Sequence, residues 1–144
     1  MIYVDSSALV SLHFHDTNTP AALALVAAAR KPLLITSLGE LEAVNAFYRR
    51  VFRKELSPSN VIVAVGDLEA DIQSGIFQLH SMPQSAFTRA KALAGTITAS
   101  IGVRTYDVLH VAAALELGAH TLYTFDRKQR DAALAAGLKV KSLP

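Results

Sequence analysis

Short apolar runs rich in β-branched and aromatic residues alternate along this chain with longer segments of helical pattern. Five runs are expected to form strands: residues 2–4, 33–36, 76–80, 121–124 and 139–142. Parallel strands need crossover connections, which are usually helices, and the segments between the runs are long enough to supply them. The alternation therefore predicts an α/β fold with a central, mostly parallel sheet of about five strands flanked by helices.

Capping residues and glycines set the expected helix boundaries. Side-chain oxygens of Asn, Thr and Ser can cap a helix whose first turn holds proline. Such starts are Asn18 or Thr19 with Pro20, Ser57 with Pro58, and Pro83, which opens a helix running toward Ser100. Two later helices should end at Gly118 and Gly137, because glycine readily adopts the left-handed conformation beyond a helix terminus.

The composition indicates one compact domain, residues 1–144, with a buried interior. Hydrophobic residues make up 51% of the 144 residues, and a chain of this size fits the usual range for a single domain. Cysteine is absent, as suits a reducing cytoplasm. We expect no membrane association, because the longest apolar run, 21–29, is about half the length of a spanning helix. Asp5 interrupts the N-terminus too early for a secretory signal.

Four carboxylates stand at the joints of this pattern. Asp5 closes the first expected strand and Asp126 closes the fourth, while Asp107 opens an apolar helical stretch and Glu42 lies early in another helix. Ligands of open α/β sheets bind beyond the carboxyl ends of the strands, so these side chains can meet there. Gathered without basic partners they would repel one another, and a hard cation such as Mg²⁺ would complete the cluster.

Each carboxylate also has an ordinary explanation. Asp5 and Asp126 could serve as helix N-caps, Asp107 could complement a helix dipole, and Glu42 could face solvent. Their apolar surroundings and converging positions favour a shared metal site, because an unpaired carboxylate is costly in such a setting.

Basic residues flank the acidic ones, although the net charge is only +2. One group follows Glu42 and a second follows Asp126: Arg49, Arg50, Arg53 and Lys54, then Arg127, Lys128 and Arg130. Either group alone could be a solvated helix face. A basic rim around an acidic metal centre is what a phosphodiester substrate requires, since the rim holds phosphates while the metal offsets repulsion at the centre.

Four motifs in order resemble those of PIN-domain ribonucleases, specifically VapC-type toxins of type II toxin-antitoxin pairs. They read IYVDSSALV at 2–10, LEAVNAF at 41–47, YDVLHVAAA at 106–114 and TFDR at 124–127. The resemblance covers essentially the whole chain and implies a three-layer PIN-like fold. It assigns metal binding and catalysis to Asp5, Glu42, Asp107 and Asp126, with Ser6 and Thr124 as supporting polar neighbours.

The resemblance also implies a function and its partners. We expect a Mg²⁺-dependent endoribonuclease, with Mn²⁺ as a possible substitute, that leaves a 3′-hydroxyl and a 5′-phosphate. RNA is the expected substrate, contacted by Arg49, Arg104 and Arg127. A small cognate antitoxin and a homodimeric state are the expected protein partners.

Several alternatives remain open at the level of sequence. Glu40 lies two residues from Glu42, so only one of them should reach the site; the motif favours Glu42. His110 lies on a similar helix face to Asp107, and a buried or supporting role is favoured over catalysis. A haloacid-dehalogenase-like phosphatase also begins with Asp after a strand, but Ser7 stands where it needs a second Asp. A catalytically inactive module that binds RNA or protein is the third possibility.

Overall fold

The sheet contains five parallel strands in the order β3-β2-β1-β4-β5. The computed structural model describes residues 1–141, and the strands are β1 (Ile2–Val4), β2 (Leu33–Thr36), β3 (Phe77–His80), β4 (Thr121–Tyr123) and β5 (Lys139–Lys141). The predicted α/β class is therefore confirmed.

The strand order places a topological switch point at the centre of the sheet. From β1 the chain moves outward to β2 and β3, then crosses back to β4 on the other side of β1 and moves outward to β5. Tyr3 in β1 pairs with Leu34 on one side and with Leu122 on the other. The crevice beyond the carboxyl ends of β1 and β4 is thus the place where an open α/β sheet offers a binding site.

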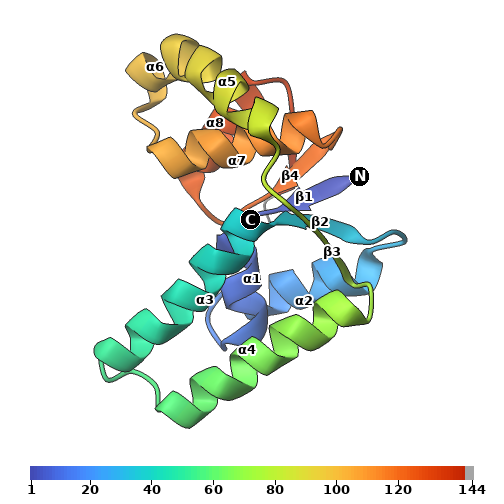
Figure 1. The fold of residues 1–144 in the computed structure, drawn as a ribbon, viewed down its shortest axis with the longest axis vertical. Coiled ribbons are helices and arrows are strands. Elements are labelled where there is room, and N and C mark those ends of the chain that lie inside the picture. Colours follow the sequence, from blue (N-terminus) through green and yellow to red (C-terminus); the bar gives the residue numbers. More distant parts are fainter. Residues whose placement is uncertain (142–144) are drawn as a thin grey trace.

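Helices cover both faces of the sheet and complete three layers (Figure 1). One face carries α1 (Ser6–His13), α2 (Thr19–Ala28), α3 (Ser37–Phe52) and α4 (Pro58–Gln73). The other carries α5 (Gln84–Leu93), the π-helical segment η1 (Ala94–Thr98), α6 (Ala99–Ile101), α7 (Thr105–Glu116) and α8 (Arg127–Ala135). None of the helices within residues 1–141 is long and apolar enough to cross a membrane.

Two apolar cores lie on either side of the sheet because successive strand residues point to opposite faces. Tyr3 and Leu122 belong to the core that also contains the apolar residues of α7. Val4 and Tyr123, each one residue further along, belong to the core beneath α1, α3 and α4. Both faces of the central strands are therefore buried, as their continuous apolar sequence requires.

Most of the predicted helix starts and helix ends are found at the expected residues. The Ser57 hydroxyl caps α4 by accepting a hydrogen bond from the Asn60 N–H at 3.2 Å, whereas the Asn18 side chain makes no capping hydrogen bond to α2. Gly118 and Gly137 follow α7 and α8 with positive φ of 70° and 87°. Pro83 is the N-cap of α5, and the expected helix continues to Ile101 through η1.

Strand ends differ from the prediction by one residue. Ile76 precedes β3, since its N–H donates to the Asp71 carbonyl at the end of α4. Thr124 lies beyond β4 and turns its hydroxyl to a carboxylate. Ser142, expected at the end of the last strand, lies outside the described residues.

Candidate active site

Asp5 stands directly after β1 and is both the N-cap of α1 and a buried member of the site. It is only 2% exposed. Its Oδ1 accepts hydrogen bonds from the Ser7 hydroxyl at 2.6 Å and the Ala8 N–H at 3.2 Å, and its Oδ2 accepts from the Thr124 hydroxyl at 2.7 Å. Burial raises the pKa of Asp5, although these three hydrogen bonds and the charge of His110 act in the opposite direction.

Thr124 connects Asp5 to the loop that carries Asp126. Its hydroxyl oxygen accepts a hydrogen bond from the Asp126 N–H at 2.9 Å while the same hydroxyl donates to Asp5. Asp126 in turn caps α8, since its Oδ1 accepts from the Gln129 N–H at 3.0 Å. The ordinary N-cap reading therefore holds for Asp5 and Asp126, and the capping geometry is what aims both carboxyl groups at the carboxyl edge of the sheet.

Asp107 lies in the first turn of α7 and is held by Arg104. Its Oδ2 accepts from the Arg104 N–H at 3.1 Å and from Nε at 3.0 Å, and its Oδ1 accepts from Nη2 at 3.3 Å. The Nη2 group also lies 3.3 Å from Asp126 Oδ2. One guanidinium thus joins carboxylates from two elements that are separate in sequence.

Glu42, in the second turn of α3, pairs with His110 of α7. His110 Nε2 lies 2.6 Å from Glu42 Oε2, and His110 Nδ1 lies 2.7 Å from the Tyr3 hydroxyl. Tyr3 also contacts the hydroxyl of Thr36, the N-cap of α3, at 2.9 Å. Burial acts to raise the pKa of Glu42, but the hydrogen bond and charge of His110, with contributions from Ser6 and Arg104, bring it below its usual range.

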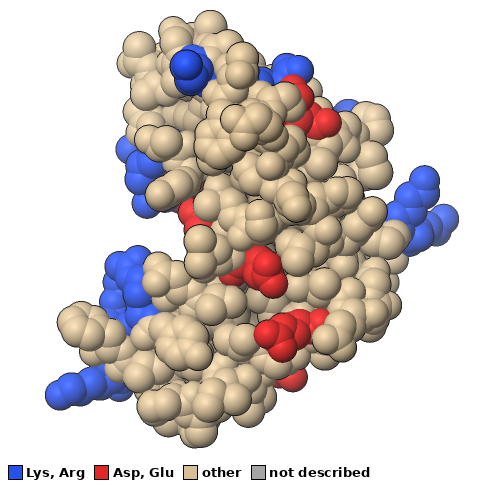
Figure 2. Space-filling model, viewed as in Figure 1, with Lys and Arg blue, Asp and Glu red and all other residues tan. Residues whose placement is uncertain are grey.

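The four carboxylates are therefore drawn to one edge of the sheet from β1, α3, α7 and the β4-α8 loop. Glu42, favoured over Glu40 from the motif, pairs with His110, which lies three residues after Asp107 on α7. An open pocket of about 410 Å³ beside Asp126 is lined by Ser6, Ser7 and Ala46 among others. Figure 2 shows the molecule hollowed between α3 and the start of α7, with acidic side chains in the hollow and basic ones on either side of it.

The expectation of acidic groups without basic partners is wrong. Arg104 bridges Asp107 and Asp126, and His110 pairs with Glu42. Both partners come from α7 or the residue before it: His110, for which a buried or supporting role was expected, and Arg104, which was expected to contact RNA. The predicted neighbour Ser6 lies beside Glu42, whereas the hydroxyl bonded to Asp5 is that of Ser7. Ser7 carries a local signal, because a polar residue two after an N-cap Asp can reach its carboxyl group.

The donor chemistry of the site suits a hard cation, since Mg²⁺ prefers carboxylate oxygens and keeps several waters. The arrangement is a less complete match. Among residues 1–141, no three side chains of His, Cys, Asp or Glu come together closely enough to form a metal-binding group. Asp107 and Asp126 instead share the guanidinium of Arg104. The carboxylates are suitable ligands for a divalent ion. The guanidinium of Arg104 lies between two of them, Asp107 and Asp126, in the place of a cation.

Comparison with known proteins gives the family. The PIN domain model matches residues 2–134, so the chain belongs to the PIN domain family, and the resemblance predicted from the four motifs is confirmed. No curated protein matches the sequence.

Solved structures share this fold over nearly their full length. VapC20 of Mycobacterium tuberculosis, described as a sarcin-ricin loop cleaving toxin, aligns with a TM-score of 0.72 at 18% identity and covers 96% of each chain. FitAcB of Neisseria gonorrhoeae gives 0.70 at 14% identity, covering 99% of this chain and 97% of that one. VapBC2 of Rickettsia felis, bound to a promoter DNA fragment, gives 0.70 at 17% identity and covers 100% of both chains. The predicted three-layer PIN-like fold is thereby confirmed.

Proposed function

We propose that this protein is a metal-dependent endoribonuclease whose catalytic residues are Asp5, Glu42, Asp107 and Asp126. The observation that carries the proposal is that four carboxylates lie at the carboxyl edge of the sheet near its switch point: Thr124 and Arg104 link Asp5, Asp126 and Asp107, and His110 of α7 pairs with Glu42. A fold is shared by many activities, so the assignment rests on these side chains.

The chain's own residues would divide the work by their surroundings. Asp5 is fixed by three hydrogen bonds at the bottom of the site. Asp126 has better access to solvent, with 32% of its side chain exposed, whereas the side chain of Asp107 is 9% exposed. Together with Glu42 these residues would hold Mg²⁺, for which Mn²⁺ can substitute. Such an ion lowers the pKa of water and offsets negative charge on the reacting phosphate.

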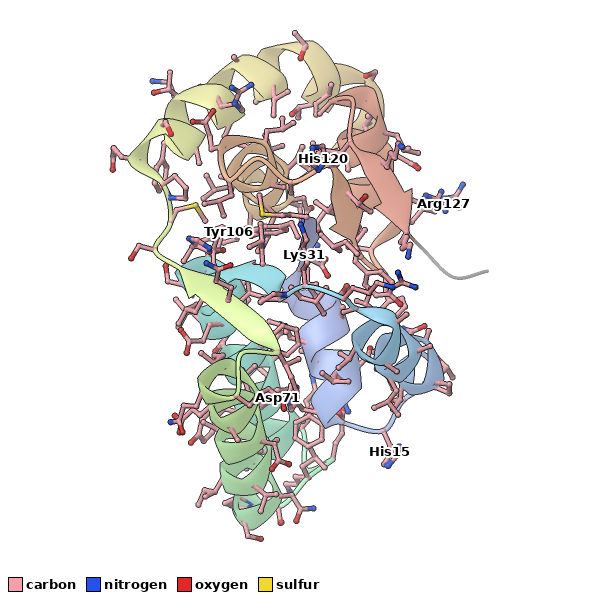
Figure 3. All side chains as sticks on the ribbon, turned by 90° about the vertical axis from the view of Figure 1, so that its right-hand side faces the viewer. His15, Lys31, Asp71, Tyr106, His120 and Arg127 are labelled. Atoms are coloured by element: carbon pink, nitrogen blue, oxygen red, sulfur yellow. The ribbon has the colours of Figure 1, made fainter. Side chains whose placement is uncertain are left out.

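An RNA backbone is the substrate that the surrounding charge favours. Arg49 lies seven residues after Glu42, or two helical turns and about 10 Å further along the same face of α3. Arg127 begins α8 directly after Asp126 and points outward (Figure 3). These two arginines, with Arg104, are proposed to contact phosphates on either side of the acidic centre.

The biological role proposed is that of a toxin restrained by a small antitoxin in the cytoplasm. The support is the membership of the PIN family, the resemblance of the motifs to VapC-type toxins and the fold shared with VapC20, which is itself described as a toxin.

A homodimer is proposed as well. Two neighbouring apolar pockets share Phe87, Tyr106 and Leu109, and Phe87 and Tyr106 are 46% and 59% exposed.

The strongest alternative is an inactive module that binds RNA or protein. It is favoured by two observations: Asp107 and Asp126 pair with Arg104, and the described residues contain no three-residue metal-binding group. The phosphatase alternative is weaker, because Ser7 stands in the place of the second aspartate. Its hydroxyl donates a hydrogen bond to Asp5 and accepts one from the Phe125 N–H.

Cleavage of a labelled single-stranded RNA separates these functions. The purified protein should cut it with Mg²⁺, stop with a chelator, and leave 5′-phosphate and 3′-hydroxyl ends. Asp107→Asn keeps the side-chain volume. Its cleavage activity should fall by more than the 10- to 100-fold that is typical when a supporting residue is replaced. Equal cleavage by Asp107→Asn at matched purity would refute the catalytic assignment; binding without cleavage by the wild type would favour the inactive module.

A further inference from the structure

The guanidinium of Arg104 occupies a position between two carboxylates of the proposed metal site. It contacts both oxygens of Asp107 and the Oδ2 atom of Asp126, at 3.0 to 3.3 Å. Asp107 belongs to α7 and Asp126 caps α8, so this single side chain connects the two helices at the mouth of the site. A positive charge in this position does part of what a bound cation would do.

A divalent cation can replace Arg104 in its contact with Asp107 and Asp126. The Arg104 side chain is 74% exposed, and exposed ion pairs contribute little to stability because solvent screens them. Asp107, in contrast, is 9% exposed at its side chain, so its charge still needs a partner when Arg104 leaves. A divalent cation has twice the charge of the guanidinium and prefers the same oxygens.

The backbone is held independently of the side chain. The Arg104 N–H donates to Asp107 Oδ2, the preceding Val103 is buried, and Asp126 Oδ1 is fixed by the Gln129 N–H. Swinging the arginine side chain away therefore leaves α7 and α8 capped. The oxygens that it frees are Asp107 Oδ1 and Asp126 Oδ2, which accept only from Arg104 among the described residues.

We propose that Arg104 is an internal counter-ion that competes with the divalent metal for Asp107 and Asp126. It stabilises the metal-free protein and must be displaced for the metal to bind, so it sets the metal concentration at which the site fills. This inference rests on the proposed function and adds a control on the same site.

Calorimetric titration with Mn²⁺ tests the competition directly. Arg104→Gln should bind Mn²⁺ about 5- to 30-fold more tightly than the wild type, the range expected when one or two exposed ion pairs no longer compete. Its metal-free Tm should be lower and its metal-induced rise in Tm larger. Arg104→Lys keeps the positive charge but loses the planar guanidinium, so its Mn²⁺ affinity should lie between that of the wild type and that of Arg104→Gln.

Arg89→Gln is the matched control. Arg89 is also an exposed arginine paired with an acidic residue of α7, Glu116 at the other end of that helix. Its loss should leave Mn²⁺ affinity unchanged. An Arg104→Gln affinity equal to or weaker than that of the wild type would overturn the inference alone if the wild type binds Mn²⁺ and cleaves RNA. Absence of Mn²⁺ binding by both folded proteins would overturn the inference and the proposed function together.

A measurement on the wild type covers the case in which the variant does not fold. The Arg104 Nε–H, hydrogen-bonded in the metal-free protein, should give a nuclear magnetic resonance signal protected from exchange with water. Saturation with Mg²⁺ should remove that protection and move the signal toward the position of a free arginine. A signal that stays protected at saturating Mg²⁺ would show that metal and arginine do not compete.

Discussion

At the scale of residues, the carboxylates of the site have different surroundings and therefore different properties. Burial raises the pKa of Asp5. Glu42 is also partly buried, which acts to raise its pKa, but His110 reverses the effect and leaves it lowered. The interaction with His110 thus decides the direction of the pKa shift for Glu42, and desolvation decides it for Asp5.

Replacing Asp5 by Asn should remove cleavage and stabilise the fold at neutral pH. A carboxyl group whose pKa is raised by folding adds stability below its unfolded pKa, and that contribution is lost as pH rises through the folded value. The wild type therefore pays for a buried charge at pH 7, and Asn does not. We expect a gain on the order of 1 kcal/mol, or roughly 3 °C in Tm, at pH 7.

The gain from Asp5→Asn should shrink as pH falls toward the ordinary aspartate value of 3.8. Thermal melts of wild type and variant across this range measure it, with Asp67→Asn, an exposed change on α4, as the control. A difference in Tm between the two proteins that grows on acidification would contradict a raised pKa for Asp5.

Tyr3→Phe should weaken both stability and activity. The change leaves His110 Nδ1 without the tyrosine hydroxyl and removes one partner of Thr36 in a buried setting, which costs about 1–3 kcal/mol. His110 then positions Glu42 less firmly, and cleavage should fall about 10- to 100-fold, as for other supporting residues of metal sites. Urea unfolding and RNA cleavage measure the two effects.

Tyr123→Phe provides the comparison for Tyr3→Phe. Tyr123 donates to the Ala21 carbonyl at 3.1 Å on the opposite face of the sheet. Its replacement should cost stability without an effect on cleavage. Equal cleavage by the two variants would argue that Tyr3 has only a structural part.

At the scale of elements, helix starts position the site. Asp5 and Asp126 are N-caps, and Asp107 lies in the first turn of its helix. The positive end of a helix dipole stabilises a negative charge at each of these places. Helix termini at one edge of the sheet thus allow like charges to approach one another before any metal is bound.

Two glycine substitutions should have opposite effects, because the glycines stand in different elements. Gly66 lies inside α4 with no neighbouring atom within 4 Å of an added Cβ, so Gly66→Ala should stabilise by about 0.5–1 kcal/mol. Gly102 has a φ of +67° at the end of α6, where alanine costs about 1–2 kcal/mol. Urea midpoints measure both changes; shifts of the same sign would refute the reasoning.

At the scale of the whole molecule, the site lies between the two helical layers. α3 belongs to one layer and α7 to the other, and the hollow of Figure 2 opens between them. The His110–Glu42 pair spans this boundary. The packing of both layers on the same sheet therefore sets the distance between the acidic residues and the width available to a ligand.

RNA binding should depend on salt in a way that identifies the basic residues involved. In an Asp107→Asn background, which prevents cleavage, the logarithm of the affinity should fall linearly with the logarithm of salt concentration, by about 0.7 for each phosphate neutralised. Arg49→Gln and Arg127→Gln should each reduce the steepness by about that amount. Fluorescence anisotropy with a labelled single strand measures the slope.

Lys31→Gln is the control for the salt experiment. Lys31, labelled in Figure 3, stands just before β2, at the amino edge of the sheet and therefore opposite the site. Its replacement should leave the slope unchanged. An equal reduction by Lys31→Gln would mean that RNA binds without preference for the acidic centre.

The sequence alone determined the order of strands and helices, the alternation that buries both faces of the sheet, and the positions of the carboxylates after β1 and β4. These features follow from signals that act over a few residues: periodicity, caps and glycines. The choice of Glu42 also came from a local motif.

Only the tertiary structure decided which distant groups pair with Glu42 and Asp126, whereas the Arg104–Asp107 pair is local. His110 is 68 residues from Glu42 and 107 from Tyr3, and Arg104 is 22 from Asp126. No local pattern encodes such pairs, because they depend on how α3, α7 and α8 pack across the sheet. The sequence therefore placed negative charges at one edge, and the packing of the two layers brought Arg104 to Asp126 and His110 to Glu42 as their partners.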